Sequence, residues 1–297
     1  MDGFSFEGRV AVVTGAGRGI GRAHAKLLAE RGAQVVVNDL GGSMEGEGAD
    51  RGPAATVVAE IVADGGAAVA DASDVASVDG AQTLVDTALS RFGRVDIVVN
   101  NAGIIRWAGF PEVDAENIES HLAVHLLGSF NTIRAAWPQF NEQGYGRIVN
   151  TTSSGMFGLP NNPGYAAAKA GVVGLTRSVA VAGAERGIKA NLVAPAAYTR
   201  MAGARGDDDS MMAAHLVAPM VAFLAHEDCP VSGEVYAAGA GRFARIFIAQ
   251  APGFVDGSGA PTVEDVAAHW DEINDEADYT VPADLMAWSA AFLAHQS

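Results

Sequence analysis

The sequence contains a single cysteine, Cys229, and few charged residues for its length. One cysteine excludes an internal disulfide and any zinc site built from several thiolates, and we interpret Cys229 as a small buried apolar residue. Basic residues are especially scarce, because 19 Lys and Arg stand against 35 Asp and Glu, for a formal net charge of -16. A nucleic-acid backbone would be repelled over most of such a surface, so we expect no nucleic-acid partner.

Long apolar runs are missing as well. No uninterrupted apolar segment approaches the roughly 18 residues that cross a bilayer, and the first residues, MDGFSFEGRV, lack the basic and apolar regions of a secretory signal. The last residues, AFLAHQS, do not match a Ser-Lys-Leu address. We therefore expect no membrane partner and a cytoplasmic location. None of the seven histidines falls in a His-Glu-x-x-His pair, so we also expect no metal site.

Short β-branched runs alternate with longer alanine-rich stretches along most of the chain. RVAVVT precedes GRAHAKLLAERG, QVVVND precedes AATVVAEIVADGG, and VDIVVNNAG precedes ENIESHLAVHLLGSFNTIRAAW. Continuous apolar strands separated by helices are typical of a parallel sheet that is covered on both faces. The fold class that we predict is α/β, a doubly wound parallel sheet of the Rossmann type.

Two regions interrupt this alternation. Residues 40–53, LGGSMEGEGADRGP, are rich in glycine and acidic residues and predict an excursion after the second strand. From about Gly239 the pattern stops. GRFARIFIAQ can still pair as a strand, whereas TVEDVAAHWDEINDEAD and PADLMAWSAAFLAHQ predict helices, the second with Pro282 near its first turn. We predict a main domain over residues 1–243 and a helical C-terminal extension, 244–297, packed on the same domain.

A glycine cluster lies between the first strand and the first helix. VVTGAGRGIGRAHA places Gly15, Gly19 and Gly21 there, together with Arg18 and Ile20. Glycines at these positions let backbone N–H groups approach a pyrophosphate at the positive end of a helix. The order of strand, glycines and helix is typical of dinucleotide-binding proteins. The main domain is therefore predicted to bind a dinucleotide.

Asp39 closes the second strand, where the adenosine ribose of a dinucleotide is expected. A carboxylate there accepts hydrogen bonds from both ribose hydroxyls and repels a 2′-phosphate. Arg18 can favour a 2′-phosphate, but Asp39 is expected nearer to the hydroxyl, so we predict NAD rather than NADP. Asp74 and Val75, after the third strand, are interpreted as the border of the adenine site. The alternative for Asp74 is an acidic residue near the start of the next helix.

Tyr165 and Lys169 lie four residues apart in GYAAAKAG, so one turn of a helix would bring their head groups together. The strand before them ends in NTTSSG, at the carboxyl edge where open α/β sheets bind ligands. On these residues the chain resembles the short-chain dehydrogenase/reductase family over about residues 8–243. The motifs that carry the resemblance are TGAGRGIG, NNAG at 100–103, the serine before YAAAK, and NLVAPAAYTRM.

Within that family, the chain is similar to the (3R)-hydroxyacyl-CoA dehydrogenase unit of peroxisomal multifunctional enzyme type 2, also described as 17β-hydroxysteroid dehydrogenase type 4. VVVNDLGG, VHLLGSF, LVAPMVAFLAHEDC and AGAGRFARI carry this resemblance. It implies a catalytic domain that oxidises a secondary alcohol with NAD, a (3R)-3-hydroxyacyl-CoA or a steroid-type side-chain thioester. Two alternatives are kept: a dehydrogenase for an uncharged alcohol or ketone (a steroid nucleus, terpenoid or aryl carbinol), and a non-catalytic dinucleotide-binding scaffold.

The resemblance also implies roles for single residues. Tyr165 would be the general base, and Lys169, with the positive nicotinamide ring, would lower the phenol pKa from about 10. Lys169 would also hold the nicotinamide ribose. Ser153 would hydrogen-bond the substrate oxygen. The usual family spacing before the tyrosine indicates Thr152 instead. Alignment of the strand GRIVNTTS indicates Ser153, and we prefer Ser153 because strand register is more constrained than loop length. Thr152 is kept as the second choice.

Further residues follow from the same resemblance. His125 stands where the wider family has an asparagine that anchors a water of the proton relay, and an imidazole can both donate and accept; the alternative is a structural histidine. We interpret His121, one turn earlier, as a surface residue. The cofactor edge would be lined by Asn100, Asn101, Ala102 and Gly103, with Pro195 and Thr199 facing the nicotinamide amide.

Two kinds of substrate require two kinds of surface. A CoA thioester needs a local basic patch on this acidic protein, for which the candidates are Arg106, Arg200, Arg205, Arg242 and Arg245. An uncharged substrate needs an apolar pocket, for which the candidates are Trp107, Met156, Phe157, Leu159, Tyr198 and Met201. The small residues of YAAAKAGVVGLTRSVAVAG suit close helix packing, so we also expect a homo-oligomer, a homodimer in preference to a homotetramer.

Overall fold

The computed structural model describes residues 3–197, 211–257 and 259–294 of the chain. Contacts between residues divide the chain into two compact units, Met1–Arg245 and Ile246–Ser297. The predicted packing of the C-terminal extension on the main domain concerns the relation between these units and stays a prediction. Among the residues that the structure describes, none of the helices combines the length and the apolar character of a bilayer-crossing segment.

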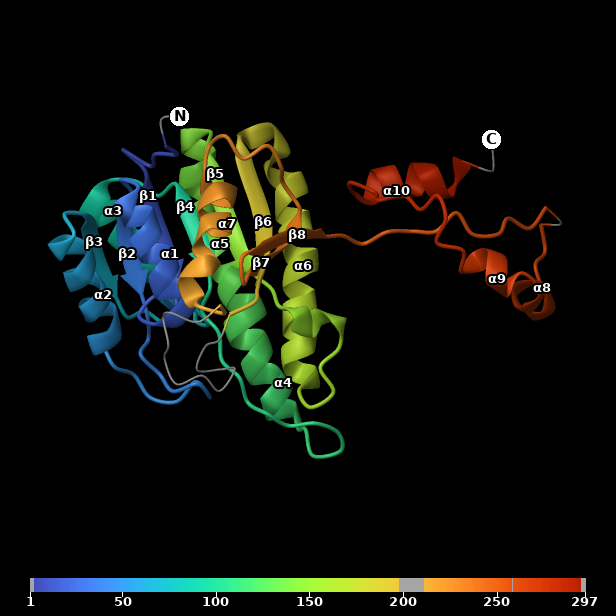
Figure 1. Ribbon diagram of the computed structural model, residues 1–297, viewed down its shortest axis with the longest axis horizontal. Helices are drawn as coiled ribbons and strands as arrows, with labels where there is room; N and C mark the ends of the chain where they lie inside the picture. Colours follow the sequence, from blue (N-terminus) through green and yellow to red (C-terminus); the bar gives the residue numbers. More distant parts are fainter. Residues whose placement is uncertain (1–2, 198–210, 258, 295–297) are drawn as a thin grey trace. The chain divides into compact units, whose positions relative to one another are not determined.

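An eight-stranded sheet in the order β3-β2-β1-β4-β5-β6-β7-β8 organises the first unit (Figure 1). The strands are β1 (Val10–Thr14), β2 (Gln34–Asn38), β3 (Ala67–Asp71), β4 (Ile97–Asn100), β5 (Gly146–Thr151), β6 (Ile188–Pro195), β7 (Val235–Gly239) and β8 (Arg242–Ile246). Neighbours from β3 through β7 pair in parallel, and Val12 of β1 lies beside Val36 of β2 and Val98 of β4. The order runs outward from β1 on both sides, which confirms the predicted doubly wound parallel sheet.

The last strand, β8, returns along β7 as a hairpin. Ala240 and Gly241 connect the two strands, and their φ angles are 50° and 73°. Positive φ at both residues of a two-residue connection is typical of a type I′ turn, whereas a parallel strand needs a crossover of about a dozen residues or more. Within the segment GRFARIFIAQ, residues Arg242–Ile246 therefore form an antiparallel edge strand, as the sequence allowed.

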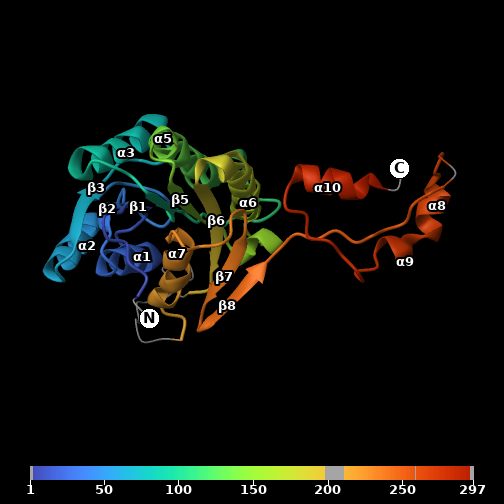
Figure 2. The same ribbon diagram turned by 90° about the horizontal axis from the view of Figure 1, so that it is seen from above.

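Helices cover both faces of the sheet (Figure 2). One face carries α1 (Gly19–Glu30), α2 (Gly52–Ala63) and α7 (Ala218–Ala225), and the other carries α3 (Val78–Phe92), α5 (Gly128–Gln143) and α6 (Pro163–Gly183). Helix α4 (Ala115–His121) continues into α5 through a π-helical segment, η1 (Leu122–Leu127). Short 3-10 turns are η2 (Ser154–Phe157), η3 (Ala184–Arg186) and η5 (Ala214–Leu216).

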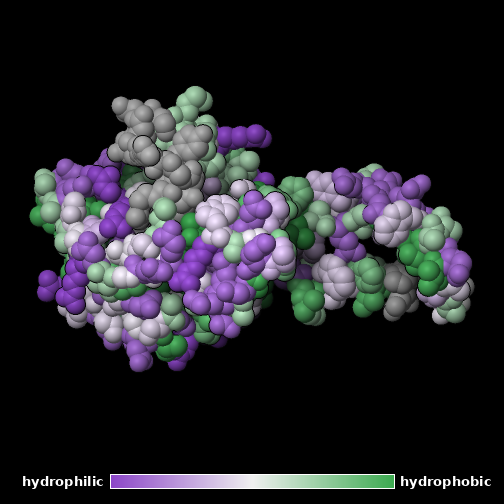
Figure 3. All heavy atoms as spheres, turned by 90° about the horizontal axis from the view of Figure 1, so that it is seen from below, coloured by the Kyte–Doolittle hydropathy of each residue, from purple (hydrophilic) through white to green (hydrophobic). Residues whose placement is uncertain are grey.

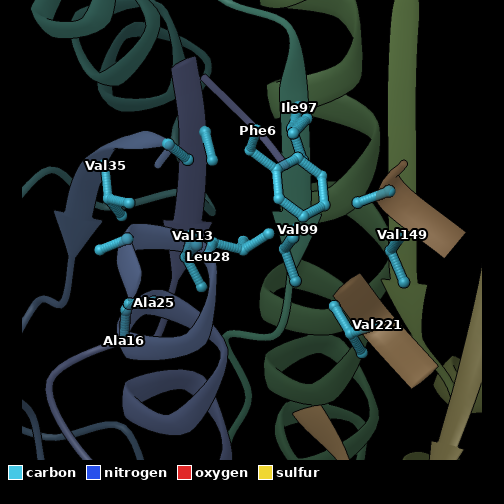
Figure 4. Close-up of a cluster of buried hydrophobic side chains, with 14 of the residues drawn as sticks. Phe6, Val13, Ala16, Ala25, Leu28, Val35, Ile97, Val99, Val149 and Val221 are labelled. Atoms are coloured by element: carbon cyan, nitrogen blue, oxygen red, sulfur yellow. The ribbon is translucent and has the colours of Figure 1, made fainter. Parts of the chain in front are cut away.

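The apolar core lies in two layers, one on each face of the sheet. All residues of β1, β4 and β5 are buried, because their side chains meet helices in both directions. One layer includes Phe6, Leu28 and Val35 and lies between the sheet and α1, α2 and α7 (Figure 4). The other includes Leu84 and Phe140 and lies under α3, α5 and α6. This packing holds the carboxyl ends of the strands at one edge, where the motif loops begin.

The second unit contains α8 (Val263–Ala268), α9 (Trp270–Ile273) and α10 (Leu285–Phe292). The predicted helix over TVEDVAAHWDEINDEAD is divided at His269, whose ring stacks on Phe254 with 3.6 Å between the ring centroids. The expectation that Pro282 lies near the first turn of the last helix is wrong. Asp284 is the N-cap, since its carboxylate accepts a hydrogen bond from the Ala287 N–H and satisfies a free donor of the first turn.

Candidate active site

The end of β1 and the NNAG loop after β4 are held together by hydrogen bonds. The Thr14 hydroxyl accepts bonds from the backbone N–H groups of Asn101 and Ala102, both at 3.0 Å. The Asn101 amide donates to the carbonyls of Thr14 and Gly15, both at 3.1 Å. Gly15 has φ of 60°, and a Cβ there would lie 2.8 Å from the Ala102 Cα. Only glycine therefore allows these two predicted cofactor loops to meet.

The first turn of α1 has free backbone donors. Helix α1 begins at Gly19, and Gly19, Ile20 and Gly21 form its first positions, whose N–H groups have no partner within the helix. The N-cap residue Arg18 makes no side-chain capping bond, and the first turn holds no acidic residue. A Cβ at Gly19 would meet no atom within 4 Å, so the space beside the loop is open. This arrangement fits an anionic group at the helix N-terminus.

Asp39 is anchored against the glycine loop. Its Oδ2 accepts a hydrogen bond from the Gly17 N–H at 2.8 Å, and its Oδ1 accepts one from the Gly41 N–H at 2.7 Å. Each oxygen keeps lone-pair capacity for a further donor. The Arg18 guanidinium donates to the Gly42 carbonyl at 3.4 Å, so it is directed toward the excursion that follows β2. Both features fit a ribose with free hydroxyls.

The two residues predicted at the adenine border lie in different surroundings. Asp74 is exposed and accepts a hydrogen bond from the Ala76 N–H at 2.9 Å, in the turn before α3. Ser77 is the N-cap of that helix. Val75 is buried in the second core layer, and its carbonyl accepts a hydrogen bond from the Asn131 amide. Asp74 is thus placed near the helix start, as in the alternative, while contact of either residue with adenine stays a prediction.

Ser153, Tyr165 and Lys169 form one group at the carboxyl edge of β5. The Asn162 side chain caps α6 by accepting a hydrogen bond from the Tyr165 N–H at 3.1 Å. One turn later, the Lys169 ammonium lies 5.8 Å from the centroid of the Tyr165 ring and donates to the Thr151 carbonyl at 2.7 Å. Ser153 lies on the same side of the site, since a Cβ at Gly155 would be 3.1 Å from the Tyr165 ring and 3.4 Å from the Ser153 hydroxyl. The helical spacing and the end of the strand therefore bring three predicted residues together.

Burial moves the two titrating groups of this site in opposite directions. It lowers the pKa of Lys169 from 10.5 to about 7, because a buried ammonium loses its hydration. It raises the pKa of Tyr165 from its usual value of 10.0, and the nearby Ser153 hydroxyl partly opposes that rise. The predicted lowering of the Tyr165 pKa depends on the positive nicotinamide ring beside Lys169, so it stays a prediction about the complex.

Thr152 and Ser153 point to different partners, which separates the two candidate hydroxyls. The Thr152 hydroxyl is buried and donates to the Lys169 carbonyl at 2.7 Å, whereas Ser153 faces Tyr165. We expect Ser153→Ala to lower kcat about 100-fold, the effect of removing one donor to a developing oxyanion. Thr152→Val should instead lower the free energy of unfolding by about 1 kcal/mol and change kcat only a few-fold. Steady-state kinetics and urea unfolding of both variants test this, and the reverse order would identify Thr152 as the catalytic hydroxyl.

His125 lies on the π-helical segment, fully buried against Tyr165, with 5.3 Å between the two ring centroids. Its Nε2 lies 2.9 Å from the Ile104 carbonyl oxygen and 3.3 Å from the Ile104 N–H. We assign the proton to Nε2 from the shorter contact. Nδ1 then has no hydrogen-bond partner among the described residues. Burial, and secondly Lys169, lowers the pKa of His125 well below 6.5, so the ring is neutral.

The interpretation of His121 as a surface residue is wrong. Its side chain is fully buried and stacks on His125 with 6.0 Å between ring centroids. Its Nδ1 donates to the Asn117 carbonyl at 2.8 Å, and its Nε2 accepts from the Arg106 N–H at 3.2 Å. Polar groups of a loop bury this face of α4, so a search for apolar periodicity could not find it.

The Asn100 side chain points into the fold, so contact of this residue with the cofactor stays a prediction that only its backbone could meet. Its side chain is buried, donates to Asn150 at 2.9 Å and accepts from Thr132 at 2.7 Å, so its polar atoms are used inside the fold. Gly103 does reach the site, because a Cβ there would lie 2.5 Å from the His125 ring. Pro195 ends β6, and Thr199 lies outside the described residues.

Two of the five candidate CoA-binding arginines are paired with carboxylates. Arg106 pairs with Glu116 at 3.2 Å, and Arg245 pairs with Glu234 at 2.7 Å. Arg242 and Arg245 lie on β8, which three strands separate from β4, whereas Arg106 follows β4. Arg200 and Arg205 lie outside the described residues. A basic patch built from these five residues therefore gains no support from the part of the chain that is described.

The four candidate apolar residues that the structure describes lie after β4 and β5, at the carboxyl edge of the sheet. Trp107 and Phe157 are exposed, and Met156 and Leu159 are half-buried. Tyr198 and Met201 belong to the residues that are not described. Figure 3 shows hydrophilic and hydrophobic side chains mixed over the face of the first unit seen from below. Among the described residues, no group of three or more His, Cys, Asp or Glu side chains could hold a metal ion.

The doubly wound sheet, the glycine loop at α1 and the Ser–Tyr–Lys group define an oxidoreductase of the Rossmann type. The family model "short chain dehydrogenase" matches residues 9–210, so the chain belongs to the short-chain dehydrogenase/reductase family.

Individual relatives agree with this assignment. The chain is 47% identical over 270 residues to a Mycobacterium tuberculosis protein whose name places it among the short-chain type dehydrogenases/reductases, covering 90% of this chain and 94% of that protein. It is 43% identical over 282 residues to mouse peroxisomal multifunctional enzyme type 2, covering 93% of this chain but 38% of the mouse enzyme. A crystal structure of a short chain dehydrogenase from Mycobacterium avium superposes with a TM-score of 0.81 at 38% identity, covering 92% and 98% of the two chains. The predicted resemblance is confirmed.

Proposed function

We propose that this protein is an NAD-dependent dehydrogenase that oxidises the hydroxyl of a (3R)-3-hydroxyacyl-CoA, or of a steroid-type side-chain thioester, to the ketone. The observation that carries the proposal is the group of Ser153, Tyr165 and Lys169 at the carboxyl edge of β5, in which the buried Lys169 ammonium lies beside the Tyr165 ring. Contacts connect this group to the glycine loop, since Tyr165 meets His125, and His125 meets Gly103 of the NNAG segment. A proton acceptor and a dinucleotide cradle therefore share one edge of the sheet.

The residues present fit a nicotinamide dinucleotide. The free N–H groups at Gly19–Gly21 suit its pyrophosphate, and Asp39 suits the adenosine ribose hydroxyls. NAD is favoured over NADP because the Asp39 carboxylate would repel the 2′-phosphate that NADP carries on this ribose. When bound, the dinucleotide supplies the hydride acceptor, and Lys169 would hold the nicotinamide ribose.

Side chains of the protein would accept and transfer the hydroxyl proton of the alcohol. The Tyr165 oxygen accepts the hydroxyl proton of the alcohol, and the Ser153 hydroxyl donates to the substrate oxygen and keeps it in place. Lys169, charged in the complex, favours the deprotonated phenol. The neutral His125 offers Nδ1 as an acceptor in the same buried region, which suits a relay of that proton.

A second substrate class is favoured by a specific observation. Arg106 and Arg245, two of the candidate phosphate-binding residues, are paired with carboxylates, while Trp107 and Phe157 expose apolar surface in the loops of the same sheet edge. An uncharged alcohol, such as a steroid nucleus, terpenoid or aryl carbinol, would need this apolar surface and no phosphate contacts. A homo-oligomer, with a dimer favoured, and a cytoplasmic location are part of the proposal.

The test is an assay of NADH formation with a panel of (3R)-3-hydroxyacyl-CoA thioesters and uncharged secondary alcohols, run with NAD and with NADP. The proposal expects turnover of a thioester, a preference for NAD, and competition by free CoA. Turnover of uncharged alcohols with no effect of free CoA would favour the second class. NADH binding without turnover of any alcohol would favour a non-catalytic scaffold.

A further inference from the structure

The excursion after β2 is an ordered loop, here called the strap (residues 40–50). Its base is closed by a hydrogen bond from the Asp50 N–H to the Leu40 carbonyl at 2.9 Å. At its tip the Ser43 hydroxyl accepts bonds from the N–H groups of Glu45 and Glu47, both at 3.2 Å. Gly41 has φ of 80° and a Cβ there would collide with the Asp50 carbonyl, so only glycine allows this closure.

The strap crosses the end of the sheet at which the dinucleotide cradle lies. It starts after β2, and its tip meets the loop after β4, while β1 lies between those two strands (Figure 1). Two hydrogen bonds make the contact: the Ile105 N–H donates to the Met44 carbonyl at 2.9 Å, and the Arg106 Nε donates to the Glu45 carbonyl at 2.8 Å. Arg18 of the glycine loop donates to the strap at Gly42. The strap therefore passes over the carboxyl end of β1, from which the glycine loop departs.

Arg106 connects this strap to the helices of the site. Its guanidinium also pairs with Glu116 of α4 at 3.2 Å. Its backbone carbonyl accepts amide hydrogen bonds from Asn117 at 2.8 Å and from Asn162 at 3.0 Å, and Asn162 is the residue that caps α6 at Tyr165. A side-chain substitution at Arg106 would remove the contacts to the strap and Glu116 but leave these backbone contacts in place.

We propose that Arg106 is a positioning residue that fastens the strap over the dinucleotide groove and thereby slows release of the dinucleotide. The proposal rests on the proposed function, because it requires the groove to hold a dinucleotide. The strap tip is exposed and has few buried contacts of its own, so a charge-assisted bond to the Glu45 carbonyl is a large part of what holds it. Arg106 thus holds the strap instead of binding a CoA phosphate.

Two measurements on the wild type, Arg106→Ala, Arg106→Lys and Glu116→Gln test this. The first is hydrogen exchange of residues 40–50 and of the Ile105 amide in the cofactor-free protein. The second is the rate of NADH release after rapid dilution, followed by NADH fluorescence. We expect Arg106→Ala to accelerate both exchange and release about tenfold, as for loss of one charge-assisted hydrogen bond. Glu116→Gln, which keeps the bond to the strap, should stay within about twofold of wild type, and the lysine variant should fall between them.

Several outcomes separate this proposal from the proposed function. Unchanged exchange and release in Arg106→Ala, with thermal stability close to wild type, would overturn the fastening role. Equal acceleration in Arg106→Ala and Glu116→Gln would also overturn it, because the cause would then be a loosened α4. If Arg106→Ala does not fold, the lysine variant and Glu116→Gln make the same comparison. A wild type that binds no NADH would instead overturn the proposed function, and with it the proposed effect on NADH release. Hydrogen exchange in the cofactor-free protein would still test whether Arg106 holds the strap in place.

Discussion

Tyr165→Phe is expected to lower kcat for alcohol oxidation about 1,000-fold, within the range attributed to general acid–base catalysis. The variant keeps the ring that packs against His121 and His125 and loses the oxygen that accepts the substrate proton. KM for NAD and the free energy of unfolding should change little, because the lost atom is a single hydroxyl. Initial rates of NADH formation, with NADH binding followed by fluorescence, measure both properties.

Tyr145→Phe is the matched control for that variant. Tyr145 lies just before β5, at the opposite end of the strand from Ser153, with its ring between the guanidinium groups of Arg9 and Arg147, 3.8 Å and 4.2 Å from the ring centroid. Phenylalanine keeps both ring contacts, so kcat should stay within about twofold of wild type. A Tyr165→Phe enzyme as active as this control would show that the proton goes to another group.

Lys169→Met should abolish most activity and yet stabilise the cofactor-free protein at pH 6. Burial lowers the Lys169 pKa from 10.5 to about 7. This shift means that charging Lys169 costs roughly 5 kcal/mol more in the folded protein than in the unfolded chain. Methionine has a similar length and needs no hydration. We expect a gain of several kcal/mol in the free energy of unfolding at pH 6, reduced by about 1 kcal/mol for the lost bond to the Thr151 carbonyl.

The sign of the pH dependence follows from linkage. Between about pH 7 and pH 10.5 the unfolded chain binds a proton at Lys169 that the folded protein does not, so the wild type gains stability as the pH rises through this window. Below pH 7 both states are protonated, and the contribution is constant. The advantage of Lys169→Met should therefore be greatest below pH 7 and largely vanish near pH 10. Urea unfolding of both proteins from pH 6 to pH 10 measures this difference.

Lys189→Met serves as the control for the stability measurement. Lys189 also donates to a backbone carbonyl, that of Cys229, but it is only half-buried, so its charged form keeps part of its hydration. This variant should show no gain at pH 6. If Lys169→Met were destabilised equally at pH 6 and at pH 10, the lysine would be charged and well solvated in the folded protein, with a pKa close to that of the unfolded chain, contrary to the expectation. A stabilised but inactive Lys169→Met would indicate that the site holds a buried charge for function at a cost in stability.

Local patterns were sufficient for the sheet and for the outline of the site. Strands of a parallel sheet are buried on both faces, so β1, β2, β4 and β6 had to be nearly continuous apolar runs that stand out from the helices. The glycine loop was visible because contacts such as that of Gly15 with Ala102 leave no room for a Cβ. The spacing of Tyr165 and Lys169 predicted that their head groups lie together, because one turn of a helix sets their relation regardless of what surrounds it, whereas their roles came from the family resemblance.

The partners of the polar side chains depended on loops that are distant in the sequence. His121 is buried because the backbone of Arg106 reaches it, and Asn100 is turned inward by Thr132. Neither contact has a period or a spacing that could be recognised along the chain. The pairing of Arg106 with Glu116 and with the strap likewise appears only once three segments are folded together.

The local patterns were apolar strands, a glycine turn and one turn of helix. They were sufficient to predict the architecture and to place Tyr165 beside Lys169 before any contact was known. The direction of each polar side chain is decided by which donor or acceptor the folded chain brings within about 3 Å of it. Thr152 and Ser153 illustrate the difference, because two adjacent hydroxyls with the same local pattern face the Lys169 carbonyl and the Tyr165 phenol.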